Sequence, residues 1–146
     1  MPYIRIWIHL VWSTKNREPL LTMPIRSRVF DHIRENAKVK DIFLDSVNGY
    51  VDHVHCLISL GAEQMVAKTT QLIKGESSFW VNKNRLTTPR LDWQDEYFAV
   101  SVGESQVKHV RQYIQNQEEH HRKKSFGDEV DEFIEKYGFQ RFDDLK

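Results

Sequence analysis

The segment YIRIWIHLVWS, residues 3–13, alternates strictly between two sets of side chains. One set is Ile4, Ile6, Ile8, Leu10 and Trp12, and the other is Tyr3, Arg5, Trp7, His9 and Val11. Successive side chains of a strand point to opposite faces of a sheet, so this alternation predicts a strand with one face in the core. The aliphatic set is the expected core face, which leaves Trp7 and His9 on the other face.

The order of the later segments narrows the fold class. Helical spacing of apolar residues predicts four helices, at about 25–38, 62–84, 104–122 and 127–138, with Gly138 ending the last. Three more strands are expected, at 42–47, 50–60 and 97–102. Between the first two of these, the pair Asn48-Gly49 predicts a tight hairpin turn. The order is that of a ferredoxin-like (RRM-like) split β-α-β sandwich. We expect one α+β domain over residues 1–146, with an antiparallel sheet and additional C-terminal helices.

This topology assigns a direction to the side chains of GYVDHVHCLISL, residues 49–60. The two crossover helices cover one sheet face, so Val54 and Cys56 should point into the core beneath them. His53 and His55 then share the opposite, open face with Trp7 and His9. Several folds bind single-stranded nucleic acid on an open sheet face that carries aromatic and cationic side chains. By the same alternation we expect Asp52 to face away from the histidines, and we do not count it as a ligand.

The net charge of zero conceals strongly charged blocks. Residues 1–40 hold eight basic and three acidic side chains, and residues 66–90 hold five and one. Residues 41–65 and 91–146 are net acidic, and the acidity beyond Phe126 suggests that the tail does not contact DNA. No apolar run is long enough to span a membrane. The single cysteine excludes an intrachain disulfide, which favours a cytoplasmic location.

Two histidines with one residue between them on a strand either bind a metal together or have this spacing by chance. A metal site usually needs a third protein ligand, and HVRQYIQNQEEHH, residues 109–121, offers one. His109, Tyr113 and Gln117 follow one another at four-residue spacing, on one face of the expected helix. Taken alone, Tyr113 is better explained as a packing residue and Gln117 as a helix former. His120 and His121 receive no role.

A histidine, a hydrophobic residue and a histidine on a strand, followed about sixty residues later by Tyr-x-x-x-Gln on a helix, form a distinctive combination. It resembles the single-tyrosine HUH transposases of the insertion-sequence 200/605 group (IS200-like transposases). Further stretches are similar to that family: HLVWSTKNREPLL, GYVDHVHCLISL, KGESS and WQDEYFAVSV. The resemblance runs from His9 to about Gly138.

The resemblance implies a DNA transposase that cleaves and rejoins single-stranded DNA at insertion-element ends. Tyr113 would be the nucleophile and would form a covalent 5′-phosphotyrosine intermediate. His53, His55 and Gln117 would bind a divalent cation, Mg²⁺ or Mn²⁺. Family members act as homodimers whose active sites are shared between subunits, on DNA ends that fold into hairpins. A bacterial or archaeal cytoplasm is the implied location, with no membrane partner.

Candidate DNA contacts follow from the basic blocks and the expected open face. They are Trp7, His9, Lys15, Arg17 and Lys74, with Arg26, Arg28 and Lys68 as further candidates for the DNA backbone. The basic residues have a plainer alternative, because exposed basic residues are usually only solvated. For Trp7 the alternative is packing at a dimer interface. His9 fits a DNA-facing or metal-supporting role and an inert one equally well. The alternative function is a non-catalytic or domesticated relative that binds single-stranded nucleic acid with the same fold.

Overall fold

A computed structural model describes residues 2–138 and contains one four-stranded antiparallel sheet. Its strands are β1 (Ile6–Ser13), β2 (Phe43–Gly49), β3 (His53–Leu60) and β4 (Phe98–Val102), in the order β2-β3-β1-β4. In this register Leu10 of β1 lies opposite Cys56 on one side and Ala99 on the other. The first strand is therefore central beside the third, which confirms the split β-α-β topology.

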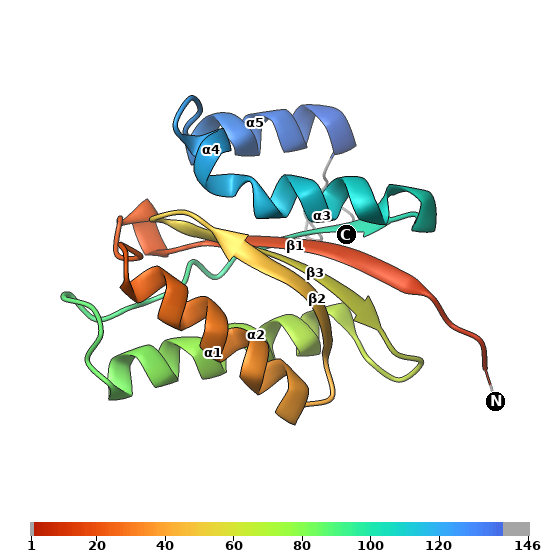
Figure 1. The fold of residues 1–146 in the computed structure, drawn as a ribbon, viewed down its shortest axis with the longest axis horizontal. Coiled ribbons are helices and arrows are strands. Elements are labelled where there is room, and N and C mark those ends of the chain that lie inside the picture. The colour runs from red at the N-terminus through yellow and green to blue at the C-terminus, as the bar shows by residue number, and fades with distance from the viewer. Residues whose placement is uncertain (1, 139–146) are drawn as a thin grey trace, which may run out of the picture.

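Two helices cover one face of the sheet, as expected (Figure 1). These are α1 (Ile25–Val39) and α2 (Val66–Lys83). The main core lies between them and the sheet, where Leu10, Val54 and Cys56 are fully buried. Val29 of α1 and Val81 of α2 complete this layer. The predicted core direction of the alternating residues is thus confirmed, and Cys56 is a packing residue.

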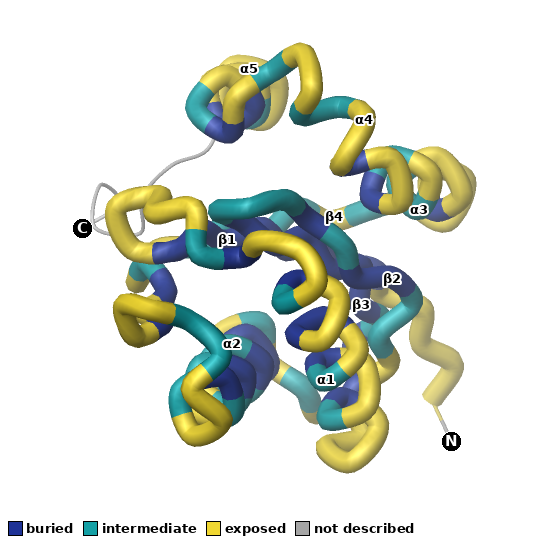
Figure 2. Tube along the Cα trace, turned by 60° about the vertical axis from the view of Figure 1, so that its left-hand side comes forward, coloured by how far each residue is buried: buried dark blue, intermediate teal, exposed yellow. Residues whose placement is uncertain are grey.

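The opposite face is not open, and this part of the sequence prediction is wrong. Three further helices cover it, as Figures 1 and 2 show: α3 (Val107–Gln115), α4 (Gln117–His121) and α5 (Phe126–Tyr137). The reason is that this face also carries apolar residues. Trp7 and Leu57 pack against α3, and Val11 packs against Phe126 of α5. The result is a three-layer domain with the histidine pair between the sheet and its second helical layer.

The hairpin between β2 and β3 also differs from the prediction. Asn48 and Gly49 are not the turn, because they pair in the ladder with His55 and Val54. The connection is made by residues 50–52. Gly49 is required for close approach instead, since a Cβ at this position would lie 2.1 Å from the carbonyl oxygen of His53. The glycine therefore sets the position of the backbone that carries the first histidine.

The expected tyrosine helix is broken. After a 3-10 turn (Glu104–Gln106), α3 ends at Gln115, and α4 begins at Gln117 beyond the kinked Asn116 (φ −96°, ψ 18°). The amide of Asn48 donates to the last carbonyl oxygens of α3, those of Ile114 (3.0 Å) and Gln115 (3.1 Å). Side chains that bond terminal carbonyls stabilise a helix end, so a residue of β2 fixes where the tyrosine helix stops.

The last helix agrees with the prediction. Gly138 follows α5 in the left-handed conformation (φ 58°, ψ 47°) that commonly ends helices. At the other end, the hydroxyl of Ser125 accepts a hydrogen bond from the backbone of Asp128. Within residues 2–138, no helix combines the length and apolar character needed to cross a bilayer.

Candidate active site

His53 and His55 project side by side from β3 and are completely buried, with ring centroids 5.1 Å apart. Each has a partner at its Nδ1 atom. Nδ1 of His53 lies 2.8 Å from Oδ1 of Asp52, and Nδ1 of His55 lies 2.8 Å from Nε2 of His9. Asp52 thus touches the histidine pair, contrary to the expectation that it faces away. Both Nε2 atoms are left to face the second helical layer.

Gln117 is brought to the histidine pair as expected. Its side chain is completely buried, and Oε1 lies 3.0 Å from Nε2 of His53. The kink at Asn116 makes Gln117 the first residue of α4 rather than part of a continuous helix with Tyr113. The three side chains expected to bind a cation therefore lie together within one chain.

Tyr113 also reaches this site. Its ring packs edge-on to that of His55 at 5.7 Å, and its hydroxyl donates a hydrogen bond to Glu129. Nε2 of His120 lies 3.5 Å from the same hydroxyl. Burial, with the negative charge of Glu129 in addition, raises the pKa of Tyr113 well above its ordinary value. The tyrosine is therefore held in its protonated form in this arrangement.

Two residues to which the sequence analysis gives no role, Glu129 and His121, complete the cluster. Glu129 of α5 is completely buried, with Oε1 2.9 Å from Nε2 of His55 and 3.5 Å from Nε2 of His53. Nε2 of His121 lies 3.4 Å from the other carboxylate oxygen. One ligand atom each from His53, His55, His121 and Glu129 lie within 4.8 Å of one another. A signal for Glu129 was present in the sequence, because it interrupts the apolar stripe formed by Phe126, Val130 and Phe133.

Burial acts differently on the acidic and basic members of this cluster. It lowers the pKa of His55 to about 4, although the hydrogen bond with Glu129 opposes the shift. Burial and then the nearby His55 lower the pKa of His9 to about 3. For Glu129 burial raises the pKa, but the contact with His121 and the hydrogen bond with His55 outweigh it and hold the pKa well below its usual range. Burial also lowers the pKa of His121, but its contact with Glu129 outweighs this and raises the pKa above the ordinary value. At neutral pH His9 and His55 are thus neutral, the form of imidazole that binds metals, beside a carboxylate.

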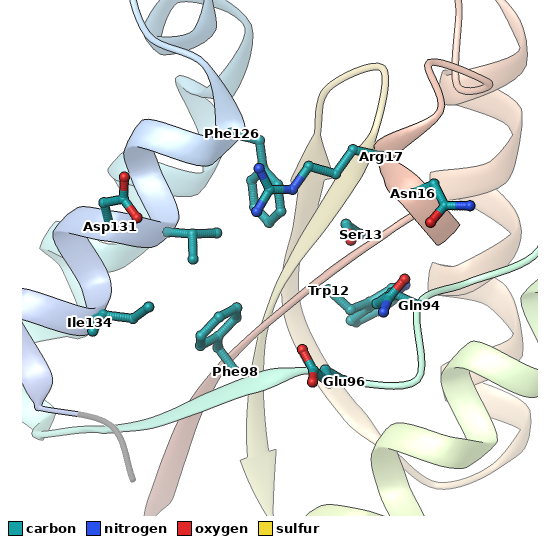
Figure 3. A pocket seen from close by; sticks show the side chains of 11 residues that line it. Trp12, Ser13, Asn16, Arg17, Gln94, Glu96, Phe98, Phe126, Asp131 and Ile134 are labelled. Carbon is teal, nitrogen blue, oxygen red and sulfur yellow. The ribbon is translucent and has the colours of Figure 1, made fainter. Parts of the chain in front are cut away.

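A cavity of about 640 Å³ opens beside the cluster, between α5 and the ends of β1 and β4 (Figure 3). Phe126 forms the wall between the cavity and the histidine cluster. Its ring stacks on that of His53, with the ring centroids 4.2 Å apart. The guanidinium of Arg17 lies 5.5 Å from the centre of the same ring. Aromatic and amide side chains, among them Phe98 and Gln94, face this cavity.

The structure separates the candidate DNA contacts into buried and exposed groups. Trp7 and His9 are buried, and the indole of Trp7 donates to Glu104 at 2.7 Å. Arg26 is also buried and bonds the carbonyl oxygen of Leu21.

The remaining candidates lie nearer the surface. Lys74 donates to the carbonyl oxygen of Gln94 on the α2 side of the sheet. The exposed candidates are Lys15, Arg17, Arg28 and Lys68. Of these, Arg17 contacts an aromatic ring that itself contacts the histidine pair.

Comparisons with known proteins identify the family of this chain. The family model for IS200-like transposases matches residues 3–117. The ISDra2 transposase TnpA of Deinococcus radiodurans is 25% identical over 115 residues, which cover 75% of this chain and 81% of that protein.

Two solved structures share the fold. A Deinococcus radiodurans R1 protein assigned as a transposase has a TM-score of 0.63 and 22% identity, over 80% of this chain and 93% of that one. A REP-associated tyrosine transposase bound to a REP hairpin has a TM-score of 0.62 and 15% identity, over 83% and 72%. Because the family match spans most of the domain, including the histidine pair, Tyr113 and Gln117, the chain belongs to the IS200-like transposases.

Proposed function

We propose that this protein cleaves and rejoins single-stranded DNA at the ends of an insertion element, through a covalent 5′-phosphotyrosine intermediate on Tyr113. One observation carries the proposal. The hydroxyl of Tyr113, the Nε2 atoms of His53 and His55, and the amide oxygen of Gln117 converge within one buried cluster. A nucleophile beside a set of metal-binding side chains is the arrangement that metal-assisted phosphoryl transfer needs.

The donor set is suited to a divalent cation. His53, His55 and Gln117 would hold it through two imidazole nitrogens and an amide oxygen, with the outer nitrogens of both histidines oriented by Asp52 and His9. When bound, the ion supplies charge that polarises the scissile phosphate and stabilises the leaving oxygen. Imidazole and amide ligands favour Mn²⁺ over Mg²⁺, although both are candidates.

The proposed cleavage step exchanges one bond at the phosphorus atom for another. The phenolic oxygen of Tyr113 loses its proton and forms a bond to phosphorus, while the bond from phosphorus to the 3′ oxygen breaks. The leaving 3′ oxygen takes up a proton to become a free hydroxyl. Rejoining reverses these steps on a second strand end, so the phosphotyrosine conserves the bond and no nucleotide hydrolysis is required.

The proposed partner is single-stranded DNA with hairpin ends, as the resemblance implies. Arg17 and Lys15 are the proposed backbone contacts nearest the site, because both are exposed on the turn that borders the cavity. A homodimer with shared active sites and a cytoplasmic location both stay predictions from the resemblance. The within-chain contact of Gln117 with His53 supports the opposite arrangement, in which each chain uses its own tyrosine.

A second candidate function is single-strand binding without catalysis. The observation that favours it is the closure of the site: His53, His55 and Glu129 have no exposed surface. A relative that binds DNA only would have no need to open this cluster.

The test is covalent capture. Labelled single-stranded DNA from the flanks of the gene is incubated with the protein and Mn²⁺ or Mg²⁺ and run on a denaturing gel. We expect a protein-linked band that needs the metal, persists in the control Tyr3→Phe, and is lost in Tyr113→Phe. Tyr3 is a suitable control because it is fully exposed. Tight binding of this DNA without an adduct would instead establish the binding-only function.

A further inference from the structure

We infer that Glu129 of α5 is a fourth protein ligand of the divalent cation in the DNA-free protein, and that the scissile phosphate takes its place when DNA binds. This inference rests on the proposed function. It concerns a part of the chain that follows the match to the transposase family, which ends at Gln117.

The spacing of the donor atoms is that of a coordination shell. Oε1 of Glu129 lies 2.9 Å from Nε2 of His55 and 3.5 Å from Nε2 of His53, and Oε1 of Gln117 lies 3.0 Å from Nε2 of His53. Ligands bound at about 2.0–2.2 Å from an ion lie roughly 3.0–3.5 Å from one another. The carboxylate oxygen, the two imidazole nitrogens and the amide oxygen therefore have the spacing that suits one cation.

The charge of Glu129 calls for a cation as well. Its side chain is completely buried, and a buried carboxylate is costly unless it is paired. Among residues 2–138, the ion-pair partners of Glu129 are all histidines: His53, His55, His120 and His121. No lysine or arginine of that range lies within 4 Å of its carboxylate. A divalent ion at this point would supply the fixed positive charge that no lysine or arginine provides.

The second carboxylate oxygen of Glu129 occupies space that the scissile phosphate would need. It accepts the hydrogen bond from the hydroxyl of Tyr113, so the carboxylate spans the space between the nucleophile and the histidine pair. A scissile phosphate has to span the same space, with one oxygen on the ion and its phosphorus atom in reach of Tyr113. Two anions cannot share that volume, and a catalytic metal keeps a position open for substrate. Glu129 therefore leaves as the phosphate enters.

The part of the structure that would move is identifiable. Glu129 is held by α5, which packs on the sheet through the small cluster of Val11, Phe126 and Val130. Ring contacts of Phe126 with His53 and of Phe133 with His9 and His55 add to this packing. His53 and His55 belong to the sheet itself. A shift of α5 removes the carboxylate and exposes the histidine pair without disturbing the main core.

Mn²⁺ binding to the DNA-free full chain tests the ligand. Calorimetric titrations compare wild type, Glu129→Gln and the control Glu135→Gln, which removes the same charge from an exposed position on α5. We expect Glu129→Gln to weaken Mn²⁺ binding by at least about tenfold, since even changes to groups behind the ligands cost 10–100-fold. The variant Glu129→Asp keeps a carboxylate, so its Mn²⁺ affinity should lie between those of wild type and Glu129→Gln. Equal Mn²⁺ affinity of Glu129→Gln and wild type, or no Mn²⁺ binding by wild type, overturns the inference.

DNA binding tests the exchange. At saturating Mn²⁺, fluorescence anisotropy with a labelled thymidine decamer should show several-fold tighter binding by Glu129→Gln than by Glu135→Gln. Equal affinities overturn the exchange. Failure of this inference differs from failure of the proposed function, because the adduct on Tyr113 is measured separately. An adduct together with unchanged Mn²⁺ affinity rejects the ligand role of Glu129 and leaves the transposase reaction standing.

Discussion

Nε2 of His9 lies 2.8 Å from Nδ1 of His55, and the two rings stack with their centroids 5.1 Å apart. Burial keeps both imidazoles neutral, with the pKa lowered to about 3 for His9 and about 4 for His55. One of the two facing nitrogens must then carry the proton. Because Nε2 of His55 donates to the carboxylate of Glu129 in this structure, Nδ1 of His55 accepts the proton of Nε2 of His9. A cation at Nε2 of His55 would require the His55 proton to move to Nδ1, where His9 is the acceptor that orients the ring.

The first prediction concerns this contact. In His9→Phe the acceptor for Nδ1 of His55 is lost, while the ring volume is largely kept. We expect Mn²⁺ affinity to fall by about 10–100-fold, the usual cost of removing a group that orients a ligand. Calorimetric titration measures it, with His109→Phe as control because His109 is exposed on α3. Wild-type affinity in the His9 variant would mean that His55 needs no such partner.

The second prediction concerns the chain that completes the site. Oε1 of Gln117 lies 3.0 Å from His53 of the same chain, and Asn48 of β2 bonds the end of the tyrosine helix. We therefore expect a mixture of Tyr113→Phe with the double variant His53→Ala/His55→Ala to form no adduct. Denaturing gels with labelled DNA measure this. Restored adduct formation in the mixture would establish that subunits share their sites, as the family resemblance implies.

The third prediction concerns Arg17, whose guanidinium lies over Phe126 at the edge of the cavity. If this side chain contacts a phosphate of the DNA, Arg17→Ala should weaken binding and reduce the slope of log K against log salt by about one. Anisotropy at several salt concentrations measures both. The control is Lys83→Ala, which removes an equal charge from an exposed position of α2 that is not a candidate DNA contact. Equal effects of the two variants would show that Arg17 acts only through general charge.

The fourth prediction compares two glycines. A methyl group at Gly49 would meet the carbonyl oxygen of His53 at 2.1 Å, whereas Gly75 in α2 has nothing within 4 Å. We expect Gly49→Ala to destabilise the fold by about 1–3 kcal/mol through overpacking. Gly75→Ala should stabilise it by about 0.5–1 kcal/mol, because alanine is the better helix residue. Urea unfolding measures both, and a neutral Gly49→Ala would show that the hairpin can relax.

The fifth prediction is a pH dependence. Both carboxylate oxygens of Asp45 on β2 accept hydrogen bonds from Arg111 of α3, each at 2.9 Å. The hydrogen bond from Arg111 lowers the pKa of Asp45, although partial burial opposes it. The folded pKa lies below the unfolded one, so the stabilisation is complete above about pH 4 and is lost as the pH falls through the folded value.

Asp45→Asn should therefore lower the urea midpoint at pH 7, and this difference from wild type should shrink as the pH falls below 4. The control is Asp31→Asn, which removes an exposed carboxylate paired with Arg34 on α1. The contact would have no role in stability if Asp45→Asn and Asp31→Asn changed the midpoint equally at both pH values.

Much of the fold could be predicted from local patterns. Alternation in β1 and β3 placed Leu10 and Cys56 on one face and His9, His53 and His55 on the other, because side-chain direction in a strand has a period of two. The order of strands and helices predicted the sheet topology. The end of α5 at Gly138 followed from one residue type that tolerates the left-handed conformation. Each of these features depends on residues close together in the sequence.

Other features were decided only by contacts between distant residues. The glycine beside Asn48 predicts a turn, but the amide of Asn48 caps α3, 66 residues further along the chain. That contact, and the break at Asn116 which accompanies it, has no local signature.

Local sequence patterns are therefore enough to predict the sheet, the face of each strand residue, and the residue types on which the family resemblance rests: the histidine pair, Tyr113 and Gln117. The covering of the histidine face by α3 to α5, and the entry of Glu129 into the cluster, depend on long-range packing. Periodicity assigns a direction to each side chain but does not specify which surface will bury it. An apolar stripe with one carboxylate, such as that of α5, can be interpreted only when the histidines opposite it are in place.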